Sequence, residues 1–246
     1  MIAGVTGRLD LTGVGATDAP LALADAHRAR SVGERVRITL LPPEDAATSW
    51  VDDQVHGGGF DLVSAAHGPP GAPVEAIAVR ARTVPDYVAA DLRVLLCGLN
   101  PSLYAADAGV GFARPGNRFW PAMLAAGVAK VDRDPRALLV HEHIGMTDLV
   151  KRATPRADAV SPEEYRAGVA RLARRAAWLQ PGAVCIIGFD GWRRVVDRRA
   201  VAGWQPGTLG HRPVYLMPNP SGLNAHTALP GFVAHLRAVV EPPPVT

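Results

Sequence analysis

Short apolar runs alternate with longer amphipathic stretches over the last two thirds of the chain. Continuous apolar runs are typical of strands buried on both faces, and the stretches between them are typical of helices. We expect strands at 94–98, 183–188 and 214–217, and helices at 117–126, 162–179, 192–199 and 227–240. The pattern therefore predicts an α/β fold: a three-layer αβα sandwich around a mainly parallel central sheet.

One helix start is strongly marked. Ser161 is the expected cap, Pro162 occupies the first helical position, and Glu164 stands three residues after the cap. One apolar helical face follows at spacings of three and four residues: Tyr165, Val169, Leu172, Ala176 and Leu179. We expect the opposite face to lie in solvent, with Arg166, Arg171, Arg174 and Arg175.

The first 83 residues show a different pattern, with short strands between glycine-rich and proline-rich turns. The pattern indicates an Ala-rich helix at 21–29 and strands at 36–41, 60–64 and 74–79. We predict three parts: a small α+β domain at 1–83, a larger domain at 84–241, and a disordered tail at 242–246.

Composition narrows the class of protein. The chain has 246 residues, of which 48% are hydrophobic, so a large packed core is expected. Its two cysteines, Cys97 and Cys185, lie inside apolar runs and predict neither a disulfide framework nor an iron–sulfur site. We see neither a signal peptide nor an apolar run long enough to cross a membrane, and we expect a cytoplasmic protein.

Charge is distributed unevenly. Residues 1–90 hold 7 Arg against 11 Asp or Glu, whereas residues 91–246 hold 19 Lys or Arg against 12 Asp or Glu. The basic part favours a polyanionic partner such as a nucleic acid. A solvated arginine-rich surface is the alternative interpretation.

Two loops show the same arrangement of residues. The first apolar run ends at Gly98 and is followed by Leu99, Asn100 and Pro101, where the proline stops the strand. The second such loop, at 217–224, also follows a strand and carries Asn219 between two prolines. In α/β sheets, ligands bind at the carboxyl ends of the strands, so the two loops can face each other across one cleft.

Several common catalytic signatures are missing. The chain contains no GxGxxG or GxxxxGK[ST] phosphate loop, no HExxH and no GxSxG. His141 and His143 form an HxH pair that is able to bind a metal, but no carboxylate stands near them at helical spacing. We expect this pair to end a helix.

Three motifs together resemble a known family. GLNPS at 98–102, GFARPGNRFW at 111–120 and NPSGLN at 219–224 resemble the mismatch-specific uracil/thymine-DNA glycosylases (the Mug/TDG group) of the uracil-DNA glycosylase superfamily. The resemblance covers about 85–240 and includes 148–150 and the strand at 180–188. It implies a uracil-DNA glycosylase fold, no cofactor or metal, and a monomer. The implied partner is double-stranded DNA with a G:U or G:T mismatch.

The resemblance also implies roles for individual residues. Asn100 would orient the water that attacks the deoxyribose, because a neutral amide can position water but not deprotonate it. The extruded base would be held by Leu99, Pro101, Ser102, Ala105, Phe112 and Asn219. The DNA wedge would be Gly222, Leu223 and Asn224. Phosphate contacts would come from Arg114, Arg118, Lys151 and Arg152, with Arg193 and Arg194 as further candidates.

The chain departs from the family pattern at several positions. Ser102 stands where glycine is usual, and Ala225 stands where arginine is common after the wedge leucine. Ala105 is small where strict uracil enzymes carry a bulky tyrosine, which favours thymine tolerance unless Tyr104 fills the space. Asn219 replaces the histidine of those enzymes.

Each role has a structural alternative: a turn-capping Asn100, a core Phe112 and a core Leu223. A catalytically weak or inactive module that binds lesions or nucleic acid is the alternative function. Residues 1–83 also resemble a TusA-like sulfur-carrier domain, which raises a sulfur-relay or RNA-modification role. No cysteine precedes Cys97, so thiolate chemistry is excluded from that part.

Overall fold

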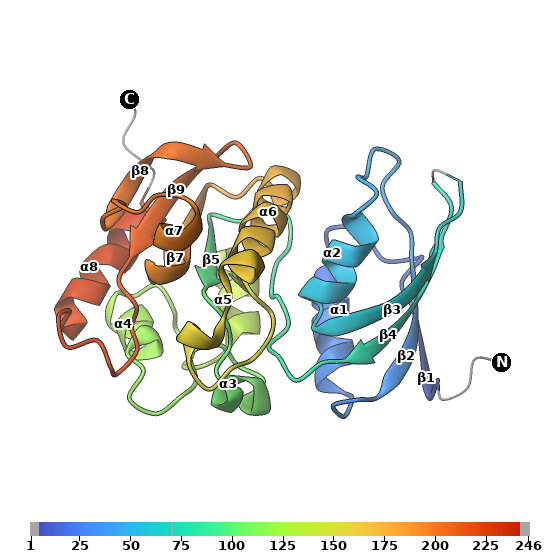
Figure 1. Cartoon of the computed structure of the whole chain (residues 1–246), viewed down its shortest axis with the longest axis horizontal. Helices are drawn as coiled ribbons and strands as arrows, with labels where there is room; N and C mark the ends of the chain where they lie inside the picture. The colour runs from blue at the N-terminus through green and yellow to red at the C-terminus, as the bar shows by residue number, and fades with distance from the viewer. Residues whose placement is uncertain (1–4, 70, 242–246) are drawn as a thin grey trace.

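The computed structural model describes residues 5–69 and 71–241, and it contains two sheets with separate hydrophobic cores (Figure 1). The first sheet has the order β1-β2-β4-β3, with β1 parallel to β2 and the other neighbours antiparallel. Its strands are β1 (Gly7–Asp10), β2 (Arg35–Leu40), β3 (Phe60–Ala66) and β4 (Val74–Arg80). Buried and half-buried residues alternate along β2, as expected for a sheet with one covered face.

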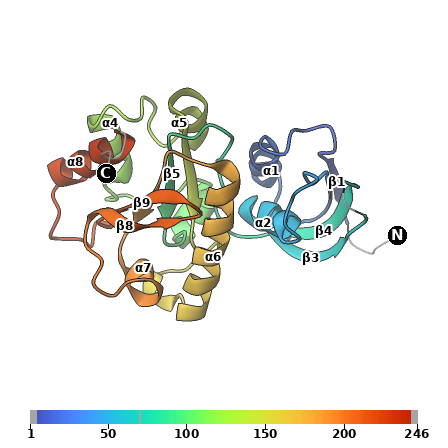
Figure 2. The ribbon, with the colours of Figure 1, turned by 90° about the horizontal axis from the view of Figure 1, so that it is seen from above.

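Two helices cover that face of the first sheet. They are α1 (Ala19–Arg28) and α2 (Trp50–Gly57), and both lie between this sheet and the rest of the molecule (Figures 1 and 2). The core beneath them contains Leu23, Val36, Ile38, Val55 and Phe60. This part is therefore the small α+β unit that the sequence predicts.

The second sheet has five strands in the order β6-β5-β7-β9-β8. Its strands are β5 (Val94–Gly98), β6 (Ile144–Asp148), β7 (Ala183–Ile187), β8 (Gly203–Leu209) and β9 (Arg212–Met217). All neighbours are parallel except β8, which pairs antiparallel with β9 at one edge. Every residue of β5, β6 and β7 is buried, so helices must cover both faces.

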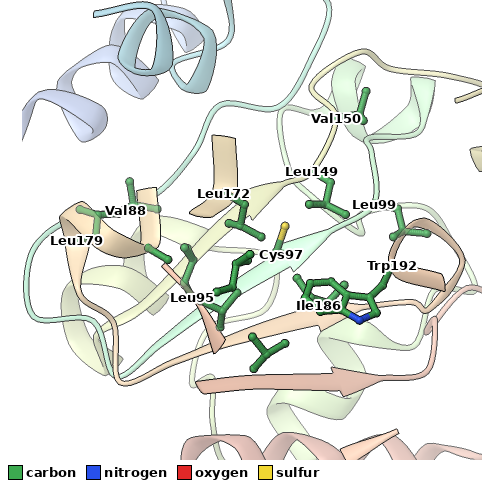
Figure 3. Packing of buried hydrophobic residues seen from close by; sticks show 14 of the residues in the cluster. Val88, Leu95, Cys97, Leu99, Leu149, Val150, Leu172, Leu179, Ile186 and Trp192 are labelled. Atoms are coloured by element: carbon green, nitrogen blue, oxygen red, sulfur yellow. The ribbon is translucent and has the colours of Figure 1, made fainter. Parts of the chain in front are cut away.

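Helices form the two outer layers around this sheet (Figure 2). One layer contains α4 (Phe119–Ala125) and α8 (Leu229–Val240), and the other contains α6 (Pro162–Leu179) and α7 (Asp190–Val195). Side chains of α6 and α7, including Leu172 and Trp192, pack on Leu95, Cys97 and Ile186 of the sheet (Figure 3). The predicted αβα sandwich with a mainly parallel sheet is confirmed.

The predicted cap of α6 is also confirmed. Ser161 accepts a hydrogen bond from the Glu164 backbone, and the Glu164 carboxylate accepts one from Ser161 N–H. The helix at 192–199 is wrong in its bounds, because α7 ends at Val195. The pattern missed β1, β6, β8, α2, α3 (Leu103–Ala108), α5 (Pro135–Glu142) and the 3-10 turn η1 (Ala157–Ala159). His143 follows the last residue of α5 in the left-handed conformation, which confirms the helix end expected there.

The prediction of a solvent-exposed arginine face on α6 holds for Arg166 and Arg174, which are exposed, but is wrong for Arg171 and Arg175. Arg171 and Arg175 are only 5% and 2% exposed, because α1 and α2 pack towards α6. Arg174 donates two hydrogen bonds of 2.7 Å to the carboxylate of Asp53 in α2. The rings of Trp50 and Trp178 meet edge to face at this junction, with centroids 5.8 Å apart.

The boundaries at 83/84 and 241/242 remain predictions, and the predicted disordered tail at 242–246 lies outside the described residues. Over the described ranges, the helices are all too short or too polar to span a lipid bilayer.

Candidate active site

The carboxyl ends of the parallel strands β5, β6, β7 and β9 meet at one edge of the sheet, and a cavity of about 460 Å³ opens there. The two asparagine loops that follow β5 and β9 both line it. Of the predicted site residues, its wall contains Leu99, Asn100, Pro101, Ser102, Ala105, Phe112, Arg114, Asn219, Leu223 and Asn224. The two loops therefore do face one cleft.

Asn100 is fixed in one orientation by hydrogen-bond acceptors. Its Nδ2 donates to the carbonyl oxygens of Arg152 and Pro101, each at 3.2 Å, and to Thr154 Oγ1 at 2.6 Å. The Thr154 hydroxyl donates its own proton to Arg156 O at 2.7 Å, so it can only accept from Asn100. Since carbonyl oxygens also only accept, the amide nitrogen must face these groups. The Asn100 side-chain oxygen is left as the acceptor that serves the cavity.

The segment at 150–154 lies alongside the loop that carries Asn100. Val150 N donates to Leu99 O at 3.0 Å, and Thr154 N donates to Pro101 O at 3.1 Å. These bonds continue the β5–β6 pairing past the end of the sheet. The backbone of 150–154 thus positions both the loop and the amide group that it carries.

Phe112 forms one side of the cavity in an unusual backbone conformation. Its φ is +59°, a region that large side chains rarely adopt, so the surrounding structure must enforce it. The ring stacks on Phe119 with centroids 4.2 Å apart and planes 24° apart. Trp120 Nε1 holds the preceding residue by donating to Gly111 O at 2.9 Å. The aromatic face at the cavity is therefore preset.

Asn219 lies across the cavity on the second loop. Its Oδ1 accepts a hydrogen bond of 3.0 Å from Ser221 N, which leaves the Nδ2 donor for a ligand. Leu223, two residues beyond Ser221, is 85% exposed. This exposure excludes the alternative of a core leucine. Gly222 lies beside Gly116, since a Cβ added at Gly222 would be 3.1 Å from Gly116 O.

Ser102 and Ala105 shape the cavity through α3. Ser102 caps this helix, because its Oγ accepts from Ala105 N at 3.1 Å. Ala105 is buried at the cavity wall, whereas Tyr104 is half exposed on the helix surface outside that wall. Leu99 contributes to the wall, but its side chain is part of the core between the sheet and α7 (Figure 3).

Asp148 is a residue of this site to which the sequence reasoning gave no role. It ends β6, directly opposite Gly98 in β5, and it is one of the residues that line the cavity. A Cβ added at Gly98 would collide with Asp148 Oδ1 and lie 3.2 Å from Phe112 Cζ. Burial raises the pKa of Asp148 to about 6, the nearby charge of Asp86 adds to the rise, and Lys151 and Arg171 oppose it. A carboxyl group whose pKa is raised by burial thus lies close to the Phe112 ring.

Two of the predicted phosphate contacts, Lys151 and Arg118, need correction. Lys151 is 3% exposed and donates to Asp86, so it cannot reach a phosphate. Arg118 donates to three backbone carbonyls of the second loop. Arg152 is half exposed and forms two hydrogen bonds with Glu164, and it remains a predicted phosphate contact. Arg114 is exposed at the cavity wall and remains a predicted phosphate contact.

Arg193 and Arg194 are also engaged within the protein. Arg193 donates to Ala200 O at 2.8 Å and covers the Phe189 ring. Arg194 lies over the Tyr165 ring and donates to Val160 O at 3.4 Å. Both arginine side chains thus contact groups of the protein itself.

A cluster of buried charged residues lies next to the site: Asp86, Lys151, Arg171 and Arg175. Asp86, which is fully buried, accepts hydrogen bonds of 2.7 Å from Thr147 Oγ1 and Lys151 Nζ and one of 3.2 Å from Arg171. Burial alone would raise the pKa of Asp86, but Lys151, Arg171 and Arg175 outweigh it and hold that pKa well below its usual range. Thr147 and Lys151 flank the segment that carries Asp148.

The same cluster joins the first sheet to the site. Asp86 N donates to Gly57 O of α2 at 2.7 Å, and Arg175 donates to Asp53 O at 3.2 Å. Thr83 Oγ1 donates to Lys151 O. The N-terminal part therefore contacts the elements that hold the cavity, and it is not a separate appendage.

A comparison with known protein families gives a match that covers this site. The family model described as "Uracil DNA glycosylase superfamily" matches residues 85–241. The matched segment contains the whole five-stranded sheet and the residues that line the cavity.

Proposed function

The chain belongs to the uracil-DNA glycosylase superfamily, and on that premise we propose that it removes uracil mispaired with guanine as a monofunctional DNA glycosylase. Superfamily membership itself indicates DNA glycosylase activity on uracil. The narrower assignment to mismatch-specific enzymes of the Mug/TDG group is supported by Asn100, which presents a neutral side-chain oxygen to the cavity. That observation carries the proposal.

The proposed reaction is a hydrolysis at C1′ of the deoxyribose. The C1′–N1 bond breaks, its electron pair leaves with the base, and water forms the new C1′–O bond and gives its proton to solvent. Asn100 Oδ1 accepts a hydrogen bond from this water and orients it, but an amide cannot take the proton. The chemistry uses water alone, so the proposal includes neither a metal nor a cofactor.

The base must first leave the DNA duplex, because the C1′–N1 bond is not accessible to the enzyme while the base is stacked and paired. In the cavity, the flat face of Phe112 offers a stacking surface that suits any pyrimidine. Leu223 is the exposed side chain placed to fill the space that the base vacates. The backbone of Gly222 and Asn224 would then face the unpaired guanine.

Ala105 sets how much room a pyrimidine has at the cavity wall. It is small and buried, and Tyr104 lies outside that wall. The proposal therefore extends to thymine and to cytosine adducts opposite guanine. One methyl group at such a wall changes the activation free energy by about 1–3 kcal/mol.

A base-release panel tests the proposed function. The full chain is incubated with duplexes that carry one G:U, G:T or A:U pair, and abasic sites are revealed by alkaline strand cleavage. We expect cleavage at G:U that exceeds cleavage at A:U. Salt-sensitive binding without release from any duplex would instead support the non-catalytic module.

Asp148 gives this proposal a pH dependence. When protonated, its carboxyl can donate to a base carbonyl and accept from the ring N3–H, whereas the charged form repels the carbonyl and the departing anion. Because the pKa of Asp148 is raised to about 6, the favourable form is present below that pH. We expect the rate of uracil release to fall by about ten-fold per pH unit above it.

The control for this expectation is Asp148→Asn. Its amide keeps one donor and one acceptor at every pH, so the variant should show a flat profile between pH 5 and 8 in single-turnover assays. It should also be faster than wild type at pH 8. A wild-type rate that rises through pH 6 would mean that the charged carboxylate is the active form, and would reject this role.

A further inference from the structure

Within 5–69 and 71–241, the hydrogen bonds that tie the loop carrying Leu223 to the rest of the protein come from one residue. Residues 219–227 form no helix or strand, and Leu223 itself is 85% exposed. Within the loop, Asn224 N donates to Ser221 O at 3.0 Å, and Asn224 Nδ2 donates to Asn219 O at 2.9 Å. These short-range bonds shape a turn, but they do not fix its position relative to the cavity.

Arg118 supplies that connection from the adjoining segment at 111–118. Its guanidinium donates to Thr227 O at 2.6 Å, to Ser221 O at 2.9 Å and to Asn224 O. Its backbone N–H donates to Pro220 O at 2.9 Å. One side chain thus binds carbonyls at the start, middle and end of the loop.

Arg118 is itself held firmly. It precedes α4, whose first residue Phe119 stacks on Phe112, and its guanidinium lies 5.0 Å from the centre of the Phe232 ring in α8. The loop with the stacking ring and the loop with the exposed leucine are therefore joined through one residue. A lysine is a poor replacement, because its donors share one nitrogen, whereas the guanidinium binds the three carbonyls from two separate nitrogens while it lies over the Phe232 ring.

We propose that Arg118 is a positioning residue that presets the 219–227 loop, so that Leu223 enters the duplex without first having to be ordered. This inference rests on the proposed function. Ordering a loop opposes binding, and a preformed loop avoids that cost. The benefit should appear only with substrates whose base must be extruded from a stacked duplex.

The test compares two substrates for each variant. The first is a G:U duplex, and the second places uracil in an unpaired bubble where extrusion is already complete. We expect Arg118→Ala to lower the single-turnover rate on the duplex at least ten-fold more than the rate on the bubble. Leu223→Ala should show the same selective loss, and the double variant should be little worse than Arg118→Ala alone.

Partial misfolding of a variant does not change the ratio of the two rates, because a smaller active fraction lowers the duplex rate and the bubble rate equally. Arg118→Lys keeps the charge and should still show the selective loss. Arg237→Ala is the matched control, because Arg237 also donates to backbone carbonyls, those of Ala125 and Ala126. Its ratio should equal that of wild type.

A second readout follows extrusion directly. A 2-aminopurine beside the uracil becomes brighter when its neighbour leaves the stack, and we expect Arg118→Ala to lose this increase. Equal losses on duplex and bubble, or an unchanged duplex rate, would overturn the positioning role. If wild type releases uracil from neither substrate, the proposed function fails, and the 2-aminopurine signal alone decides whether Arg118 orders the loop.

Discussion

Replacing Asn100 by Ala is expected to lower the single-turnover rate of uracil release about 10²–10³-fold, as is common when one oriented polar group of an active site is removed. The side-chain oxygen of Asn100 is the group that the proposal assigns to the attacking water. Affinity for a G:U duplex should change little, since the remaining cavity wall and Leu223 are intact. The measurement is the release rate at saturating enzyme, with the dissociation constant measured separately.

Asn100→Asp is the sharper variant, because a carboxylate is a stronger base than an amide. We nevertheless expect it to be slow. One carboxylate oxygen would face the carbonyl oxygens of Arg152 and Pro101, where Nδ2 now donates at 3.2 Å. Two acceptors in contact repel each other, so the group would rotate or become protonated. An Asn100→Asp variant as fast as wild type, or undiminished release by Asn100→Ala, would contradict the assigned role.

Replacing Asp86 by Ala is expected to lower the free energy of unfolding by about 3–5 kcal/mol, the usual cost of breaking a buried ion pair. Lys151, Arg171 and Arg175 would remain buried without their shared carboxylate. The pKa of Asp86 is lowered in the folded protein, so its stabilisation is present above the ordinary carboxyl pKa and is lost in strong acid. Urea unfolding at pH 7 measures the effect.

Asp107→Ala is the matched control for this prediction. Asp107 accepts two hydrogen bonds from Arg82, but that pair is open to solvent and screened by it. We expect little change in the free energy of unfolding. If the two variants were equally stable, the buried cluster would not be the connection between the two sheets that its geometry indicates.

The sequence predicted the interior of the second sheet well, for a physical reason. β5, β7 and β9 are central strands with continuous apolar runs, and that pattern is unambiguous. The sequence did not predict the two edge strands, β6 and β8. β6 contains glycine, threonine and aspartate, and β8 contains Pro206 and Gly207, which are tolerated only because β8 pairs on one side. Helix α2 was missed because its buried residues include Asp53 and Gln54.

The sequence also predicted the cavity better than its electrostatics. Asn100, Asn219 and Leu223 lie in the loops that follow β5 and β9, so their meeting in one cleft follows from a parallel sheet, whereas Phe112 lies between α3 and α4 and was predicted from the family resemblance. Lys151 and Arg171 read as surface charges, because their partner Asp86 lies 65 and 85 positions away in the chain. Asp148 was missed because its position beside Gly98 in the site depends on the register of β6 with β5. Such long-range pairings are invisible in local patterns.

The most direct test of the central claim is a crystal structure of the chain with a G:U duplex whose uridine carries a 2′-fluorine that blocks hydrolysis. The account predicts electron density for the uracil inside the cavity, stacked on Phe112, with a water between Asn100 Oδ1 and C1′ and with Leu223 in the vacated space. A duplex bound with the uracil still paired or stacked, or bound at a surface away from the cavity, would contradict it.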